Sequence, residues 1–233
     1  MGAQWKQKHR VAAADQRGRL FGKLAKEVMI AARGGADPAL NAALRMAIDA
    51  AKKQSMPRDT LERAIKKGAG LLDGAVQYEL VTYEGFAPHQ VPVIVECLTD
   101  NKNRTASSMR VLFRKGQQGA SGSVSWDFTR CGLIEARPPE HGEDAEEAAI
   151  ETGADDVQEG DEGAFSFITA PDQLDAVTRA LSDRGWHAES SALVWSPNNP
   201  VSLRGEARAE VEGWLEDMDA DDDVQKIFVA LSD

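Results

Sequence analysis

The apolar residues of this chain change their spacing at about Gly70. Before this glycine they recur at intervals of three and four residues, as on the buried face of a helix. After it, several runs alternate with polar residues or are continuously apolar, as in strands. The 233 residues are enough to bury a core and to form two or three domains. We therefore expect an α+β protein whose helices come first.

The amino-terminal domain, residues 1–74, is predicted to contain three amphipathic helices. The first begins at Gly18, where apolar residues start to recur at helical spacing. The second covers 37–53, because Asp37 is a favoured N-cap and Pro38 fits the first helical position. The third covers 57–68. Each helix would bury one face and leave lysines and arginines on the other.

Strands are predicted after this domain. Residues 78–83 and 91–98 are rich in β-branched and aromatic residues and are expected to pair across the EGFAPHQ connection. A helix capped by Asp100 or Asn101 would follow and run to Lys115. Residues 124–128 alternate between apolar and polar side chains, which predicts a half-buried strand.

The order of elements in 132–200 predicts a ferredoxin-like βαββαβ domain. Its strands are expected at 133–136, 156–158, 165–169 and 188–195, and its helices at 143–152 and 171–184. The chain then continues through a proline- and asparagine-rich linker into a helix at 205–218 and a strand at 224–229. We expect this last pair to complete the sheet that begins in the middle of the chain. The second domain would then be discontinuous, comprising 75–131 and 201–233, with 132–200 inserted.

The charges are distributed unequally along the chain. Residues 1–68 contain 15 lysines and arginines against 6 aspartates and glutamates, a charge of +9. The rest of the chain contains 12 against 32, a charge of −20, and together the two parts give the net charge of −11. Such asymmetry is typical of a polyanion-binding segment attached to an acidic body. The alternative is a basic segment that docks on its own acidic domains.

The residues that commonly carry catalysis form no recognisable site. His9, His89, His141 and His187 are scattered, no two at the i, i+4 spacing of a helical zinc site. Cys97 and Cys131 are expected to be reduced core residues of a cytoplasmic protein. No apolar run is long enough to predict a membrane helix. We therefore expect no enzymatic activity, no cofactor, no metal and no membrane partner.

Two cations stand at the predicted strand-to-helix corner after residue 98. Capping does not require Lys102 and Arg104, which fall in the first helical turn, where the helix dipole mildly disfavours cations. Two roles remain open: a salt link to the acidic body, or contact with an anionic partner together with Arg110. The second is the preferred hypothesis.

Several motifs occur in an order that resembles the YebC/PmpR family. They are KHR at 8–10, RGRLF at 17–21, the segments 37–53 and 56–68, YEG at 83–85, ECLTDN at 96–101, NRT at 103–105, GSV at 122–124, Trp126, and DDVQ at 222–225. The chain departs from the family pattern in its start, of which only Trp5-Lys6 remains, and in a shorter glycine-containing loop at 116–122. The resemblance implies a helical basic domain and two α/β domains around a cleft. Its members are labelled transcriptional regulators, and mitochondrial relatives activate translation.

We predict a non-enzymatic regulator that binds DNA through its basic helical domain. Lysine and arginine side chains gain free energy on phosphates by releasing counterions, and a tryptophan can stack on an unpaired base or pack on its own helices. The candidate residues are Trp5, Lys6, Lys8, Arg10, Arg17, Arg19, Lys23, Arg58, Arg63, Lys66, Lys67, Lys102, Arg104 and Arg110. The alternatives are a translation factor that binds ribosomal RNA and a protein-interaction scaffold that binds no polyanion. The sequence leaves open whether the protein is a monomer or a weak dimer.

Overall fold

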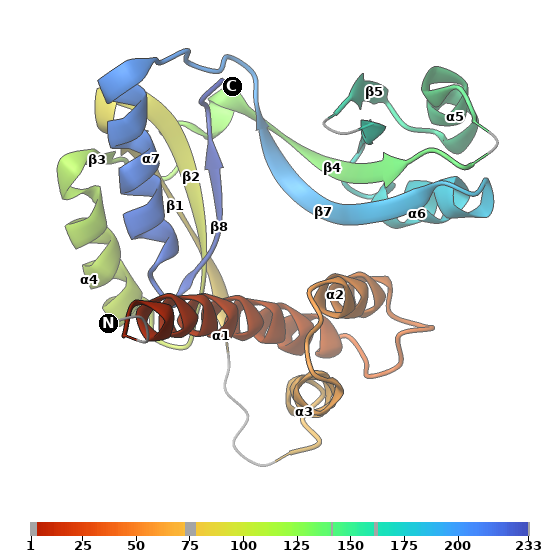
Figure 1. Cartoon of the computed structure of the whole chain (residues 1–233), viewed down its shortest axis with the longest axis horizontal. Coiled ribbons are helices and arrows are strands. Elements are labelled where there is room, and N and C mark those ends of the chain that lie inside the picture. Colours follow the sequence, from red (N-terminus) through yellow and green to blue (C-terminus); the bar gives the residue numbers. More distant parts are fainter. Residues whose placement is uncertain (1–3, 73–77, 141, 161–162, 233) are drawn as a thin grey trace. The chain divides into compact units, whose positions relative to one another are not determined.

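The structure is a computed structural model that describes residues 4–72, 78–140, 142–160 and 163–232, with only the backbone described for 4–16. The chain divides into two compact units, Met1–Glu79 and Leu80–Asp233, and each is described by itself. The first unit is helical and the second contains two four-stranded sheets (Figure 1). The predicted fold class, α+β with a helical amino-terminal region, is confirmed.

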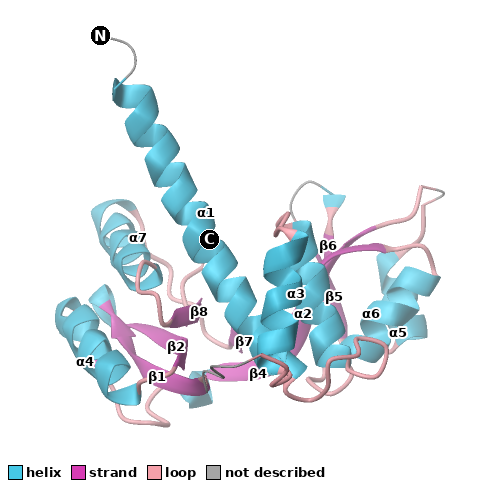
Figure 2. Ribbon diagram, turned by 90° about the horizontal axis from the view of Figure 1, so that it is seen from below, coloured by secondary structure: helices cyan, strands magenta, loops and turns pink. Residues whose placement is uncertain are grey.

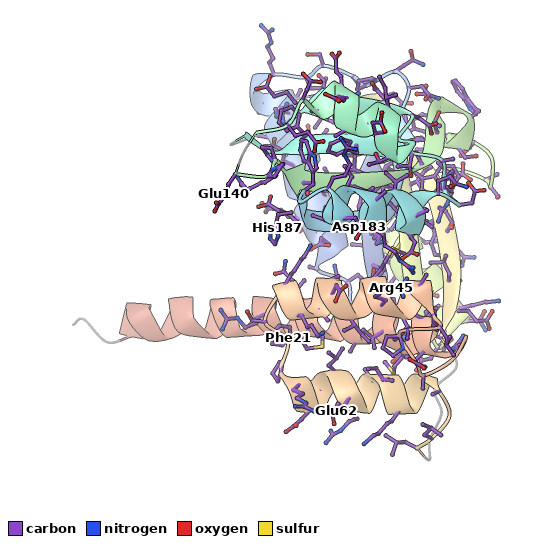
Figure 3. The ribbon with its side chains drawn as sticks, turned by 90° about the vertical axis from the view of Figure 1, so that its right-hand side faces the viewer. Phe21, Arg45, Glu62, Glu140, Asp183 and His187 are labelled. Atoms are coloured by element: carbon purple, nitrogen blue, oxygen red, sulfur yellow. The ribbon has the colours of Figure 1, made fainter. Side chains whose placement is uncertain are left out.

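Three helices form the first unit: α1 (Gln4–Ala32), α2 (Ala42–Lys53) and α3 (Arg58–Gly68). Their core contains Val28 and Ala32 of α1, Leu44 and Ile48 of α2, and Leu61 of α3. In Figure 3, Phe21 lies on the side of α1 that meets the other helices, and it packs against this core. The apolar spacing that predicted three amphipathic helices therefore corresponds to real packing.

The prediction that the first helix begins at Gly18 is wrong, because α1 already begins at Gln4. Figure 2 shows its amino-terminal half extending beyond α2 and α3. Few apolar residues are needed where a helix extends beyond its neighbours, so this half lacks the apolar periodicity on which the prediction depended. Gly18 lies within the helix, where a side chain would meet nothing within 4 Å.

The second helix also begins later than predicted. Its N-cap is Asn41, whose Oδ1 accepts a hydrogen bond from the N–H of Leu44 at 3.1 Å. The Nδ2 of Asn41 donates to the carbonyls of Ala31 at 2.7 Å and Gly35 at 2.9 Å. Asp37 instead closes a short turn by accepting from the N–H of Ala39. Asn41 is favoured as the cap because its amide satisfies three backbone groups at once.

The first sheet of the second unit has the strand order β3-β1-β2-β8. Its elements are β1 (Glu79–Ala87), the 3₁₀ turn η1 (Pro88–Gln90), β2 (Val91–Thr99), α4 (Lys102–Leu112), the 3₁₀ turn η2 (Phe113–Lys115), β3 (Gln117–Gln118), α7 (Gly205–Asp219) and β8 (Val224–Val229). Helices α4 and α7 lie side by side on one face (Figure 1). Met109 and Phe113 pack there with Trp214 and Met218 against Val93 and its neighbours in β2.

The predicted strand at 124–128 is wrong. Residues 125–127 form the 3₁₀ turn η3 (Ser125–Asp127), and a strand begins only at Phe128. Val124 and Phe128 are buried with Ile94 against the other face of the first sheet, which accounts for their apolar character. Trp126 between them is 73% exposed, and its Nε1 donates to the carbonyl of Ser123 at 2.9 Å.

The second sheet has the order β5-β6-β4-β7, all neighbours antiparallel. Its elements are β4 (Phe128–Arg137), α5 (Ala145–Thr152), β5 (Asp156–Glu159), β6 (Phe165–Thr169), α6 (Leu174–Asp183) and β7 (His187–Pro197). This βαββαβ order with the first strand between the third and fourth is the ferredoxin-like arrangement that was predicted. Both helices begin a few residues later than predicted, and Asp144 caps α5 by accepting from two N–H groups.

The pairing of β8 with β2 returns the end of the chain to the first sheet, in the register Val93 opposite Val229. Residues far apart in sequence thus share one sheet, as the closing helix and strand suggested. Both sheets lie within one compact unit. The boundaries of the three predicted domains and the cleft between them stay predictions.

Candidate nucleic-acid interface

The carboxyl end of α3 lies directly on α1. A Cβ atom placed on Gly68 would come within 2.2 Å of the carbonyl oxygen of Met29, so no larger residue fits there without moving backbone. On the inner side of α3, Leu61 and Ala64 are buried in the core of the unit. This contact fixes which side of α3 remains in solvent.

Arg63, Lys66 and Lys67 share that outer side, because residues three and four apart lie on one face of a helix. Arg63 and Lys66 are exposed and Lys67 is half-buried. Within the described part of the chain, none of the three forms an ion pair within 4.0 Å. Lys66 and Lys67 also end the helix, where the dipole favours cations. The structure therefore brings these three predicted residues together as one cationic face, which we call the α3 face.

Arg58 is less available than the other cations of α3. Its Nε donates to Oε1 of Glu62 at 2.8 Å, one turn along the helix. The hydrogen bond from Arg58, followed by its charge, lowers the pKa of Glu62. Figure 3 shows Glu62 on α3, and both members of this pair are exposed. Arg58 thus carries its own counterion, although solvent screening keeps the pair weak.

The predicted cations of the first helix fall into two groups. Arg17 and Arg19 are exposed on α1, and Lys23 is half-buried. Trp5, Lys6, Lys8 and Arg10 belong to α1 by their backbone, and their side chains lie outside the described residues. The residues from Gln4 onward form one continuous helix, so these four residues belong to α1 although the first helix was predicted to begin at Gly18.

One cation of α1 that was not predicted as a site residue has an internal role. The Nζ of Lys26 lies 5.5 Å from the centre of the Tyr78 ring, within the distance of a cation–π contact. Lys26 therefore helps to hold the end of the first unit near α1. The sequence gives no signal of this contact, because the two residues are far apart along the chain.

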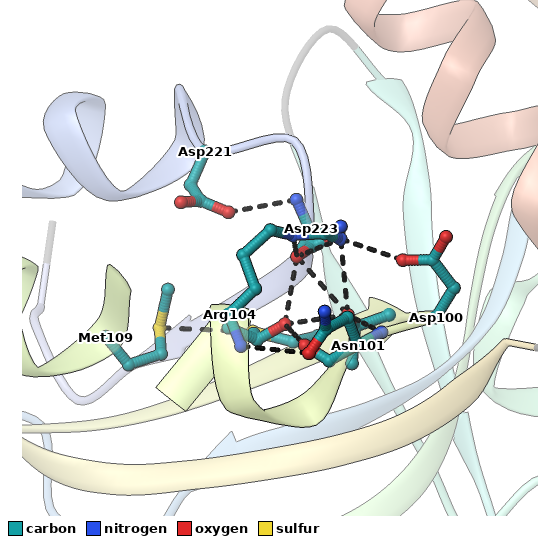
Figure 4. A network of polar contacts seen from close by, with 9 residues as sticks. Asp100, Asn101, Arg104, Met109, Asp221 and Asp223 are labelled. Atoms are coloured by element: carbon teal, nitrogen blue, oxygen red, sulfur yellow. Dashed lines mark hydrogen bonds and ion pairs between the residues drawn. The ribbon is translucent and has the colours of Figure 1, made fainter. Parts of the chain in front are cut away.

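Arg104, at the strand-to-helix corner, is held within the molecule. Its guanidinium pairs with Asp223 at 2.8 Å and with Asp100 at 2.9 Å (Figure 4). These hydrogen bonds, that of Asp223 first, raise the pKa of Arg104. Asn101, rather than Asp100, caps α4 by accepting from the N–H of Arg104. Of the two roles that the sequence left open for Arg104, the structure shows the salt link to the acidic body.

Asp223 is the centre of this network. It is 7% exposed, and its Oδ2 also accepts from the hydroxyl of Thr105 at 2.9 Å, with Thr99 at 3.3 Å. Its carbonyl accepts from the N–H of Leu98 at 2.8 Å. The network joins the corner between β2 and α4 to the start of β8. The specific ECLTDN and NRT motifs therefore serve the fold at this point.

The other two predicted cations of the second unit, Lys102 and Arg110, are exposed on α4. Lys102 begins the helix, and Arg110 lies in its last turn. Arg110 has no ion pair with a described residue. The roles predicted for Lys102 and Arg110 in binding stay predictions.

Sequence reasoning missed Glu84, which organises the loop before Trp126. Its carboxylate is 7% exposed and accepts from the N–H groups of Gly122, Val124 and Ser125 at 2.8 to 3.0 Å. Burial by itself would raise the pKa of Glu84, but the three donors together lower it. The loop that presents the exposed Trp126 is thus held by a buried carboxylate bonded to backbone N–H groups.

Both cysteines are buried, as predicted, and burial raises the pKa of the Cys131 thiol. Among the described side chains, no group of three or more histidines, cysteines, aspartates or glutamates is arranged to hold a metal ion. Within the same residues, no helix combines the length and apolar character needed to cross a membrane.

Comparison with known proteins extends over almost the whole chain. Residues 2–71 match the TACO1/YebC protein N-terminal domain, and residues 78–231 match the TACO1/YebC second and third domain. A probable transcriptional regulatory protein of Pseudomonas fluorescens (strain Pf0-1) is 60% identical over 233 residues, with 100% of both chains covered. Another from Bdellovibrio bacteriovorus is 51% identical, covering 99% of this chain and all of the relative.

A solved structure supports the same relationship. The crystal structure of a conserved hypothetical protein, Aq1575, from Aquifex aeolicus is 43% identical and has a TM-score of 0.82. The match covers 93% of this chain and 90% of the other. Sequence and fold agree, and the chain belongs to the TACO1/YebC family.

Proposed function

We propose that this protein is a non-enzymatic, cytoplasmic regulator of transcription that binds DNA through its first unit. Two kinds of support point the same way. Relatives that match the full length of the chain are named probable transcriptional regulatory proteins. The observation that carries the proposal is that the α3 face is exposed to solvent and cationic. Its three residues, Arg63, Lys66 and Lys67, form no ion pair with a described residue.

Charge favours binding by this unit rather than by the rest of the chain. Residues 1–68 carry +9, whereas the remainder of the chain carries −20. Phosphate contacts release condensed counterions, and this entropy gain depends on local positive charge rather than on the net charge of the protein. The second unit, which we call the acidic unit, would repel DNA over most of its surface, and this favours binding through the helices of the first unit.

The test is fluorescence anisotropy with a labelled DNA duplex and the full chain. The variant Arg63→Gln/Lys66→Gln/Lys67→Gln removes the α3 face, and we expect at least about tenfold weaker binding. Arg137→Gln/Arg179→Gln/Arg208→Gln is the matched control, because it changes the net charge equally but removes arginines that are already ion-paired. The control should bind within about twofold of the wild type.

Three results would overturn the proposal. The wild type could fail to bind at physiological salt, as a protein-interaction scaffold would. The control variant could lose as much affinity as the α3 variant, which would show that only net charge matters. An RNA duplex of the same sequence could bind far more tightly than DNA, which would favour a role on ribosomal RNA instead.

A further inference from the structure

The acidic unit contains one cationic segment. Residues 80–233 hold 12 lysines and arginines against 30 aspartates and glutamates. Residues 101–126 nevertheless contain five cations and not one aspartate or glutamate. This segment comprises α4, η2 and the loop that leads to Trp126. A solvated helix surface normally mixes both signs of charge, so an acid-free segment of this length in so acidic a unit needs a reason.

The arginines of this unit differ in whether they have a partner. Six of the nine form ion pairs: Arg104, Arg130, Arg137, Arg179, Arg184 and Arg208. The other three, Arg110, Arg114 and Arg204, have no ion pair with any described residue. Carboxylates outnumber cations in this unit, so the arginines without partners stand out.

Two of these three arginines share one place. Arg110 and Arg114 are four residues apart, at the end of α4 and in η2, and both are exposed. Helical spacing puts Asn103 and Ser107 on the same side, and both are exposed as well. No acid stands at i±3 or i±4 from either arginine, so the two positive charges repel each other without relief from their own helix.

This side of α4 is turned away from the acids of α7. Lys115, on a different side of the same segment, pairs with Asp217 of α7 at 3.3 Å, and the carbonyl of Leu112 accepts from Trp214. Helical spacing places Arg110 and Arg114 on the side of α4 opposite to Lys115 and Leu112. The four exposed residues form what we call the α4 face: Asn103, Ser107, Arg110 and Arg114.

We infer that the α4 face is a second DNA contact, separate from the α3 face, and that it takes phosphates of the DNA backbone. Arg110 and Arg114 would each reach a phosphate, and the guanidinium group suits this role because its planar donors match phosphate oxygens. The side-chain amide of Asn103 is also a common phosphate donor, whereas the hydroxyl of Ser107 already donates to the carbonyl of Asn103 at 2.9 Å. DNA is favoured over an acidic protein because the same chain is proposed to bind DNA through its first unit, and the phosphates of a duplex continue from one contact to the next. The inference rests on the proposed DNA binding of the first unit.

The experiment compares two double variants of the full chain on the labelled duplex. Arg110→Gln/Arg114→Gln removes both cations of the α4 face. The control, Arg137→Gln/Arg179→Gln, removes two ion-paired arginines of the same unit with the same change in net charge. We expect about fivefold to tenfold weaker binding for the first and less than about twofold for the second. Because Arg110 and Arg114 are exposed and have no ion pair with a described residue, thermal unfolding of the first variant should match that of the wild type.

The outcomes separate this inference from the proposed function. If the α3 variant loses binding while the α4 variant behaves like its control, the α4 contact is wrong and the proposed function stands. If the wild type does not bind DNA, both fall. If the α4 variant weakens binding to an RNA duplex but not to DNA, the assignment of DNA to this face is wrong.

Discussion

The two units of this protein use their cations differently. In the helical unit, Arg63, Lys66 and Lys67 have no ion pair with a described carboxylate on their face of α3. In the acidic unit, most arginines are tied to aspartates and glutamates that also fix the fold, as Arg104 is to Asp223. Whether a lysine or arginine is available to a ligand therefore depends less on its position in the sequence than on whether a carboxylate already pairs with it. A charged side chain that the fold does not use is available to a ligand.

The largest effect on stability is expected from removing Asp223, the carboxylate that pairs with Arg104. The change Asp223→Ala leaves Arg104 and the hydroxyl of Thr105 without their shared acceptor in a largely buried site. Since Arg104 is half exposed, we expect a loss of about 2–3 kcal/mol in the free energy of unfolding rather than the full cost of a buried unpaired charge. The urea midpoint measures it, with Asp172→Ala, an exposed turn residue, as the control.

DNA binding distinguishes a structural role for Asp223 from a binding role. Where the variant is still folded, its affinity for duplex DNA should match that of the wild type. An unchanged urea midpoint, or a loss of affinity without a loss of stability, would contradict the assignment of the Arg104 pair to the fold.

Glu84 is a buried anion of the acidic unit that is not held by a cation. Its carboxylate accepts hydrogen bonds from three backbone N–H groups instead. Its lowered pKa means that it stabilises the fold most above its unfolded pKa of about 4.3, and that this contribution disappears as pH falls through the lower folded value. Glu84→Gln should cost about 1–2 kcal/mol at pH 7. The stability difference between wild type and variant should shrink below about pH 4.

The matching measurement is chemical denaturation of both proteins between pH 3 and pH 8. A difference that stays constant over this range would show that Glu84 is not held as an anion by the loop. Trp126 fluorescence in the native state should also change in the variant, because the same loop carries that residue.

The smallest effect is expected at the exposed pair of α3. Glu62→Gln frees Arg58 but removes only a solvent-screened contact, so the urea midpoint should not move measurably. DNA affinity should rise slightly, by less than about threefold, because one more cation becomes available near the α3 face. Asp49→Asn, which changes the net charge in the same direction and by the same amount at an exposed site of α2, is the matched control in the same titration. A fall in affinity for Glu62→Gln would contradict this arrangement.

Much of the fold could be predicted because the spacing of apolar residues along the sequence matches the residues that the structure buries. The strands at Phe165–Thr169 and Val224–Val229 were predicted with their observed bounds, and the α3 cations were identified from their helical spacing. The errors arose where the same short sequence pattern is compatible with two different local structures. Val124 and Phe128 are apolar because both are buried on either side of a 3₁₀ turn whose Trp126 is exposed, and Asp37 begins a turn rather than a helix.

The partners of the site residues could not be predicted in the same way. Arg104 and Asp223 are 119 residues apart, and only the pairing of β8 with β2 brings them together. The same holds for Glu84, whose three donors lie in a loop about 40 residues later. Local sequence can identify a cation that could bind a phosphate, but only the fold shows which cations already have a carboxylate.

The salt dependence of DNA binding measures most directly whether cations without an ion pair contact phosphates. The logarithm of the association constant is plotted against the logarithm of salt concentration for the wild type, the α3 triple variant and the ion-paired triple control. Each lost phosphate contact reduces the slope by about 0.9, so the α3 variant should have a slope shallower by about 2–3 while the control keeps the slope of the wild type. Equal slopes for all three proteins, or a control as shallow as the α3 variant, would show that unpaired cations have no special part in binding.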